Sequence, residues 1–337
     1  MINQHGDDYP GTLKANFSSN VWYAADHTEL YRHLSGVLPS TCRYPEIEAE
    51  SFKEAIAGKL AVDTSLISIG NGSIDIIYRI AQPYRGKKSI IVSPTFSEYS
   101  NACMVNEHTV LPCNRENLFV EIDTFQPELV WICNPNNPDG YCYERKELQV
   151  LFYTYPLVTF ILDQSFVEFT LHETLAADAV LEFNNLVLIY SMTKRYTIPG
   201  LRVGYVIAPD IIIREIDQYK IPWSVNTLAI EAGKYILDRN DPSFDLASWL
   251  AETIRFQQGI DRIGMYKSIP TCTPFFLVEI LKGKASDLKG YLLSEGVLIR
   301  DATNFGYGTG ELMRLNTLSK DQNDLLLDKL RIWNQNI

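Results

Sequence analysis

Short apolar runs separated by helical patterns dominate the middle of the chain. Buried strands are predicted where these runs occur, at 66–69, 89–93, 129–133, 158–162, 186–190 and 203–208. Between the runs, apolar residues recur at helical spacing, as at Phe52, Ile56 and Leu60. Strands that alternate with helices need crossover connections, so the pattern predicts a mostly parallel sheet covered on both faces.

The pattern changes in the last third of the chain. Residues 220–238 are expected to form a helical bridge. After Pro242 we expect a helix at 246–263, three short strands at 275–280, 297–300 and 312–316, and a terminal helix. The prediction is therefore an α/β fold with two domains. The large α/β domain is expected to span 45–235, and a smaller α+β domain to combine 1–44 with 236–337.

Composition narrows the class of protein. The 337 residues are 46% hydrophobic and 21% charged, which is ordinary for a soluble globular enzyme. The net charge of −11 disfavours a nucleic-acid partner, since a phosphate backbone needs a basic face. No apolar run approaches the length of a membrane span, and the first twelve residues lack the apolar core of a signal peptide. We expect a cytoplasmic enzyme with a small-molecule substrate and no membrane partner.

Cysteine and histidine spacing gives no sign of a metal site. None of the six cysteines forms a CxxC pair, and the five histidines show no ligand spacing. We expect reduced thiols and no bound metal.

Polar residues follow three of the predicted strands directly. The segment 134–140 follows one strand, Asp163 follows the next, and Ser191 to Lys194 follow a third. In an open parallel sheet, ligands bind at the carboxyl ends of the strands. A carboxylate such as Asp163 at the end of an apolar run is costly unless it meets a cation. The three positions predict a shared ligand site.

The chemistry of that site is indicated by Lys194. A lysine at a strand end can sit in a dry pocket, where its pKa falls and the amine becomes a nucleophile. Hydroxyls precede it, and Arg202 follows a Pro-Gly turn, which suits a phosphate monoester. An amine beside a phosphate cradle predicts pyridoxal 5'-phosphate, attached covalently through the lysine.

The motifs together resemble a known superfamily. Asn134-Pro135-Asn136-Asn137-Pro138-Asp139-Gly140, Asp163-Gln164-Ser165-Phe166, the Ser191 to Lys194 motif and Arg202 resemble the fold-type-I pyridoxal-phosphate enzymes of the aspartate aminotransferase superfamily. The resemblance covers nearly the whole chain. It implies the fold of the pyridoxal-phosphate-dependent transferases, with a mostly parallel large domain and a smaller α+β domain.

Within that superfamily, the chain is similar to the branch of histidinol-phosphate aminotransferase and L-threonine-O-3-phosphate decarboxylase, a cobalamin-pathway enzyme. His5-Gly6, Phe166 in place of a commoner tyrosine, and Pro222-Trp223-Ser224 favour the decarboxylase. Both reactions use the same residues, so amino transfer stays open as the alternative. A cofactor-binding protein without catalysis is a third hypothesis, disfavoured because a binder does not need Lys194 and Asp163 together.

The resemblance implies a role for each motif residue. Lys194 would bind the cofactor and move the proton at Cα, Asp163 would keep the ring nitrogen protonated, and Asn137 would donate to the phenolic oxygen. Phe96 would stack on the ring. The cofactor phosphate would be held by Asn71, Gly72, Ser73, Ser191 and Arg202.

The resemblance also implies the substrate contacts and a dimer. Arg314 would bind the substrate carboxylate, while Arg300 and His5 would bind a second anionic group. Tyr44 would reach the cofactor phosphate of a neighbouring subunit, which implies a homodimer with shared sites. The chain departs from its relatives at 21–25, where they carry an Asn-Pro-x-Gly turn.

Overall fold

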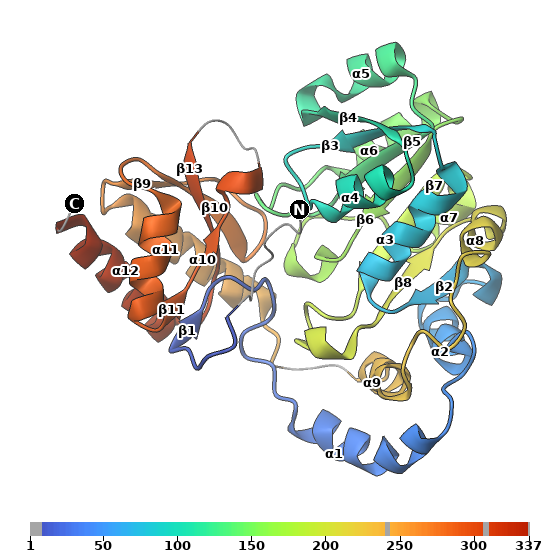
Figure 1. Ribbon diagram of the computed structural model, residues 1–337, viewed down its shortest axis with the longest axis horizontal. Helices are drawn as coiled ribbons and strands as arrows, with labels where there is room; N and C mark the ends of the chain where they lie inside the picture. Colours follow the sequence, from blue (N-terminus) through green and yellow to red (C-terminus); the bar gives the residue numbers. More distant parts are fainter. Residues whose placement is uncertain (1–8, 240–242, 306–309, 336–337) are drawn as a thin grey trace.

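A seven-stranded sheet forms the larger part of the computed structural model, which describes residues 9–239, 243–305 and 310–335 (Figure 1). Its strand order is β2-β8-β7-β6-β5-β3-β4. The strands are β2 (Ile67–Gly70), β3 (Lys88–Val92), β4 (Thr109–Cys113), β5 (Leu129–Cys133), β6 (Thr159–Asp163), β7 (Leu186–Ser191) and β8 (Gly204–Ile207). All neighbours pair in parallel except β8, which runs antiparallel to β2 and β7. The predicted mostly parallel sheet is confirmed.

Successive side chains along each strand point to opposite faces of this sheet, and they fill a hydrophobic core on each side of it. Val130 and Phe160 point into one core, whereas Trp131 and Ile161 point into the other. Helices cover both faces, as α1 (Thr28–Val37), α2 (Glu50–Leu60), α3 (Ser73–Ala81), α4 (Glu98–Val105), α5 (Leu118–Phe125), α6 (Arg145–Thr154), α7 (Ala179–Glu182), α8 (Asp210–Asp217) and α9 (Thr227–Leu237). Residues of α3, α4 and α8 line the Trp131 side, and the other six helices pack on the Val130 side. Both faces of the sheet are therefore buried, which explains its almost continuous apolar strands.

A smaller antiparallel sheet lies beside the large one, in the orange part of Figure 1. Its order is β12-β13-β10-β9, with β9 (Tyr266–Ser268), β10 (Phe275–Ile280), β12 (Arg300–Asp301) and β13 (Glu311–Asn316). The helices α10 (Leu246–Asp261), α11 (Ala285–Ser294) and α12 (Lys320–Gln335) contribute to its core. The N-terminal strand β1 (Ala15–Asn16) pairs in parallel with β11 (Val297–Leu298), which ties the start of the chain to this unit.

Short 3-10 turns complete the chain at Leu38–Cys42, Thr64–Leu66, Gln82–Tyr84, Arg115–Asn117, Val167–Phe169, Pro199–Leu201 and Thr303–Phe305. Within the described part of the chain, no helix combines the length and the apolar surface needed to cross a bilayer.

Some details differ from the expectations. The strand predicted at 297–300 is two short strands, because β11 pairs with β1 whereas β12 pairs with β13. The edge strand β4 was not predicted, and Pro112 within it breaks the usual strand pattern. Leu30 and Leu34 of α1 pack in the core of the large sheet, although 1–44 was assigned to the smaller domain. The domain limits themselves stay a prediction.

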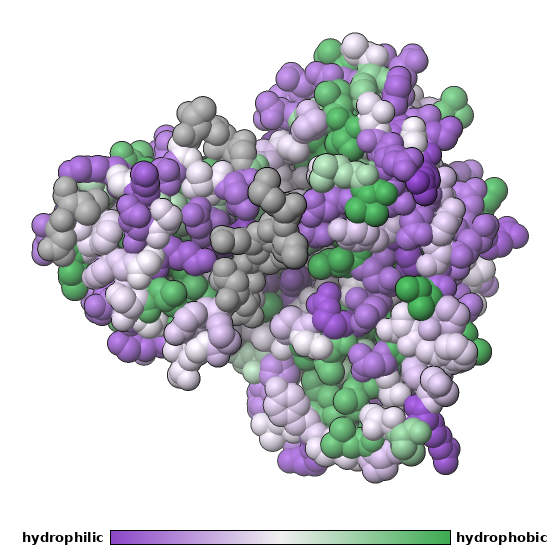
Figure 2. All heavy atoms as spheres, viewed as in Figure 1, coloured by the Kyte–Doolittle hydropathy of each residue, from purple (hydrophilic) through white to green (hydrophobic). Residues whose placement is uncertain are grey.

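The face shown in Figure 2 is mostly hydrophilic, and hydrophobic residues gather on it where α1 and α9 lie. These two helices contact each other in the fold. Several large apolar side chains are also exposed on α1, directly after it, and in the segments near Tyr44 and Trp223: Tyr31, Leu38, Tyr44, Ile47, Ile221 and Trp223.

Candidate active site

The carboxyl ends of β5, β6 and β7 meet at one edge of the large sheet. Cys133 pairs in register with Asp163, and Asp163 pairs with Ile189, so the residues that follow these strands emerge side by side. A cavity of about 90 Å³ opens there. Seven residues predicted from the sequence line it: Ser73, Phe96, Asn137, Asp163, Ser191, Lys194 and Arg202.

Lys194 lies in this cavity with its amine surrounded by protein. Burial and, after it, the positive charges of Arg314 and Arg202 together lower the pKa of Lys194 from 10.5 to about 8, against a smaller opposing effect of Asp163. Its Nζ is 5.6 Å from the centre of the Phe166 ring. The lysine can therefore supply a neutral, nucleophilic amine near neutral pH.

The loop that carries Lys194 is held by the N-terminal segment. The Trp22 N–H donates to the Lys194 carbonyl (3.1 Å), and the Thr197 hydroxyl donates to the Trp22 carbonyl (2.6 Å). Trp22 itself packs edge-on to Trp249, at 4.7 Å between ring centres. The segment 21–25, which departs from the family pattern, therefore braces the lysine loop.

Asp163 is buried at the end of β6, where its carboxylate accepts two hydrogen bonds. The Ser165 N–H donates to Oδ1 (2.8 Å), and the Tyr99 hydroxyl donates to Oδ2 (2.7 Å). Burial raises the pKa of Asp163, and these hydrogen bonds together with Lys194 oppose the rise. A carboxylate held in this way inside a cavity suits a protonated ring nitrogen.

The start of α3 and Arg202 form a cradle that fits a phosphate group. Gly72, before the helix, has φ +82°, and a β-carbon there would lie 2.5 Å from Arg202 Nη2. Ser73 is the first residue of α3, where the backbone N–H groups of the first turn are available as donors. The hydroxyls of Ser191 and Thr193, which lie 2.8 Å apart, line the same cavity. Backbone donors, hydroxyls and an arginine are what a phosphate monoester requires. Lys194, Asp163 and this cradle therefore fit the aldehyde, the ring nitrogen and the phosphate of pyridoxal 5'-phosphate, respectively.

The backbone N–H group of Asn71 has a partner within the protein. Its N–H donates to the Asp75 carboxylate (3.1 Å) and it does not line the cavity. The Asp75 side chain, in the first turn of α3, reaches back to this N–H group. Gly72 does not line the cavity either, and its place in the cradle rests on the close approach of Arg202.

A second cavity of about 330 Å³ shares Phe96 and Asn137 with the first. Arg300 and Arg314 line it, and both are buried, on neighbouring strands where they pair in register. Arg314 donates to Asn137 Oδ1 (2.7 Å) and to the Ser18 carbonyl (2.5 Å). Its Nε has no partner among the described residues.

The charge of this second cavity favours anions. Burial lowers the pKa of Arg314, and the neighbouring Arg300 adds to this effect. Two buried guanidinium groups side by side are stabilised by anionic ligands, and Asn304 accepts a hydrogen bond from Arg300 (3.3 Å). The arrangement suits a small molecule with two anionic groups.

Tyr44, like Asn71 and Gly72, is a predicted residue that lines neither cavity. His5 falls outside the described residues. Tyr44 is 84% exposed, with its ring 5.4 Å from that of Trp223, and it lines neither cavity. Among residues 9–239, 243–305 and 310–335, no three histidine, cysteine, aspartate or glutamate side chains are grouped as metal ligands.

Some cavity residues were given no role from the sequence. Thr193, Ser165, Cys133 and Tyr99 all line the first cavity. The position of Thr193, directly before the lysine, was a usable signal. The hydrogen bond from Tyr99 to Asp163 joins residues 64 apart in the sequence, so no local pattern indicates it.

The chain is similar to proteins of one family. Residues 16–330 match the family described as Aminotransferase class I and II. Threonine-phosphate decarboxylase of Salmonella typhimurium is 29% identical over 330 residues, covering 94% of this chain and 90% of that protein. Histidinol-phosphate aminotransferase of Thermoanaerobacter sp. is 30% identical over 300 residues, covering 86% and 83%. The crystal structure of L-threonine-O-3-phosphate decarboxylase from Porphyromonas gingivalis is 37% identical with a TM-score of 0.91, covering 95% of this chain and 99% of that one.

Proposed function

Because this chain belongs to the class I and II aminotransferase family of pyridoxal-phosphate enzymes, we propose that it decarboxylates a phosphorylated amino acid. The proposed substrate is L-threonine O-3-phosphate and the product aminopropanol phosphate, as in cobalamin biosynthesis. The observation that carries this choice is the 37% identity to a decarboxylase of that substrate across 95% of the chain. The paired arginines of the second cavity support it, since the substrate carries a carboxylate and a phosphate.

The cofactor supplies an electron sink next to the substrate Cα, and the chain's own residues bind and orient. Lys194 holds the cofactor covalently and then moves the proton at Cα, a task that its pKa of about 8 suits. Asp163 keeps the proton on the ring nitrogen. Asn137 has its Oδ1 occupied by Arg314, which leaves its Nδ2 group to donate to the phenolic oxygen. Phe166 has no hydroxyl to share that task.

The remaining contacts hold the cofactor phosphate and the substrate. Gly72, Ser73, Ser191 and Arg202 bind the cofactor phosphate, and Phe96 packs against the ring. Arg314 binds the substrate carboxylate, while Arg300, with His5, binds the substrate phosphate. The orientation of these arginines selects the bond that breaks, because a misplacement of about 1 Å can change a rate by about a hundredfold.

A second candidate is amino transfer from histidinol phosphate. The relative from Thermoanaerobacter sp. favours it, at 30% identity over 86% of the chain. The same lysine, aspartate and arginines serve both reactions, so the choice depends on the substrate that the second cavity orients.

The proposal includes a homodimer in the cytoplasm. Tyr44 is exposed beside Trp223 and Ile47, so a second copy of the chain can bury these apolar side chains and receive the Tyr44 hydroxyl at its cofactor phosphate. All six cysteines are free thiols, which suits a reducing compartment.

Steady-state product analysis tests the proposed reaction. The cofactor-loaded enzyme is given L-threonine O-3-phosphate, and in parallel histidinol phosphate with 2-oxoglutarate. The proposal predicts carbon dioxide from the first mixture and slow amino transfer in the second, with both reactions lost in Lys194→Ala. Efficient transfer from histidinol phosphate without carbon dioxide from threonine phosphate would sink it.

A further inference from the structure

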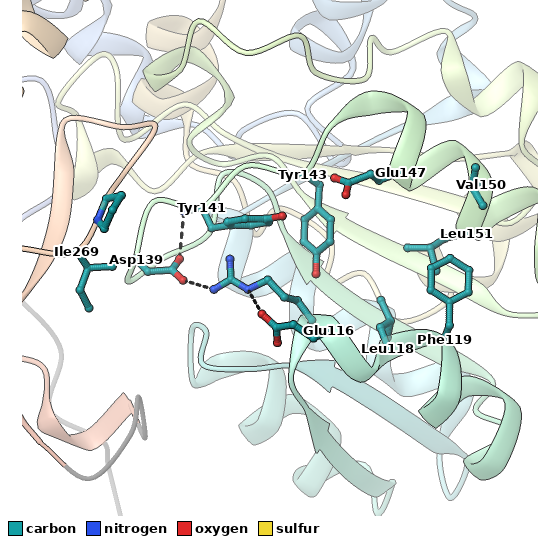
Figure 3. A pocket seen from close by; sticks show the side chains of 12 residues that line it. Glu116, Leu118, Phe119, Asp139, Tyr141, Tyr143, Glu147, Val150, Leu151 and Ile269 are labelled. Atoms are coloured by element: carbon teal, nitrogen blue, oxygen red, sulfur yellow. Dashed lines mark hydrogen bonds and ion pairs between the residues drawn. The ribbon is translucent and has the colours of Figure 1, made fainter.

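The loop that carries Asn137 also carries a buried aspartate, Asp139. Asp139 is only 2% exposed, and its Oδ2 accepts a hydrogen bond from Arg115 Nη2 at 2.6 Å (Figure 3). Arg115 comes from the turn after β4, whereas Asp139 follows β5, and β3 lies between these two strands in the sheet. A buried carboxylate is costly without such a partner, so this pair fixes the loop to the end of another strand.

The other oxygen of Asp139 organises the loop itself. Its Oδ1 accepts from Asn136 Nδ2 (2.8 Å) and from the Tyr141 N–H (3.1 Å). The Asn136 side chain in turn donates to the Pro94 carbonyl (2.9 Å) and accepts from the Thr95 hydroxyl (2.8 Å). One carboxylate therefore links the loop after β5 to the loop after β3.

The residues next to this network form two walls of the cofactor cavity. Asn137 directly follows Asn136, and Phe96 directly follows Thr95. Neither Arg115 nor Asp139 lines that cavity. We propose that Arg115 and Asp139 are positioning residues, which hold Asn137 and Phe96 at the spacing that the cofactor ring requires. The inference rests on the proposed function in placing that ring between them.

Arg115 can be reached from outside the cofactor cavity. It lines a separate hollow of about 630 Å³, formed with Tyr141, Tyr143 and Leu118 among others (Figure 3). Its guanidinium lies 3.8 Å from the centre of the Tyr141 ring, and Glu116 lies at 3.6 Å from its Nε. If the side chain is truncated, a free guanidinium ion can enter this hollow and occupy the same place between Tyr141 and Asp139.

Chemical rescue of Arg115→Ala is therefore the test. Cofactor-free protein is titrated with pyridoxal 5'-phosphate, followed by absorbance and by visible circular dichroism of the bound cofactor. We expect the variant to bind the cofactor about tenfold more weakly with an altered dichroic band, because Asp139 is left buried and unpaired. Millimolar guanidinium chloride should restore both readouts. Arg145→Ala is the matched control, since Arg145, at the start of α6, forms an exposed ion pair with Glu173 and lines neither the cofactor cavity nor the hollow beside Arg115.

A second variant keeps the inference testable if Arg115→Ala folds poorly. Asp139→Asn retains an oxygen for Asn136 and Tyr141 but loses the charge that Arg115 meets. It should weaken cofactor binding severalfold, and guanidinium should not repair it. Wild-type affinity and dichroism in both variants, or a fall in melting temperature alone, would overturn the inference. Failure of the wild-type protein to bind the cofactor would instead contradict the proposed function.

Discussion

The titration of Lys194 gives a quantitative prediction for how the cofactor attaches. Only the neutral amine can attack an aldehyde, and the pKa of Lys194 in the cofactor-free site is about 8 against an ordinary 10.5. At pH 7, about 9% of an amine with the lower pKa is neutral, against about 0.03% at the ordinary value. The site therefore raises the reactive fraction about 300-fold.

Stopped-flow absorbance measures this directly. Cofactor-free enzyme is mixed with pyridoxal 5'-phosphate at a series of pH values, and the rate of covalent attachment is recorded. We expect the rate to rise about tenfold per pH unit below pH 8 and to level off above it. A rate that keeps rising to the ordinary pKa of lysine would show that the amine is not perturbed, and would refute the reasoning.

Two variants separate the causes of that shift. Arg314 lowers the pKa of Lys194 and Asp163 raises it. Arg314→Met should move the midpoint of the rate profile to higher pH, and Asp163→Asn should move it to lower pH. Shifts in the same direction in both variants would contradict the electrostatic account.

Three further predictions follow from the same geometry. Lys194→Met should stabilise the cofactor-free protein by up to about 3 kcal/mol at pH 7, measured by urea unfolding. Because the pKa of Lys194 is near 8 in the folded protein and 10.5 in the unfolded chain, the lysine destabilises the fold fully below pH 8, and this effect disappears as the pH rises to 10.5. Equal stability of the two proteins would argue that the amine is not desolvated. Arg300→Met should raise the KM for threonine phosphate by about a hundredfold while cofactor affinity stays unchanged, since the lost contact is to the substrate phosphate. An unchanged KM would show that Arg300 does not bind the substrate. Lys194→Ala and Tyr44→Ala chains, each weakly active alone, should regain about a quarter of wild-type activity when they are coexpressed, because each mixed dimer has one intact site. No gain in activity on coexpression would disprove shared sites.

The sequence predicted that the candidate residues lie together because most of them follow strand ends. Asp163 and Lys194 each come directly after an apolar run, and in a parallel sheet such ends share one edge. The same rule identified the loop with Asn137. Burial pattern and neighbouring polar residues are local signals, so they can be read without knowing the tertiary fold.

The features that were missed depend on long-range contacts. The pairing of Arg115 with Asp139 joins residues 24 apart across two strand ends, and neither residue looks unusual in sequence. Asn71 stood beside the correct helix start, but the return of the Asp75 side chain to its N–H was not visible from spacing. The place of α1 against α9 likewise depends on packing, which the spacing of its apolar residues does not specify.

The central claim is that carbon–carbon cleavage, not amino transfer, takes place over Lys194. A single turnover in deuterium oxide with stoichiometric cofactor-loaded enzyme tests it, using L-threonine O-3-phosphate labelled with carbon-13 in the carboxyl carbon and no oxo-acid acceptor. The account predicts that the label leaves as carbon dioxide and bicarbonate, and that the aminopropanol phosphate carries one deuterium where the carboxylate was. Label retained in an oxo acid, with the cofactor left in its amine form, would contradict it.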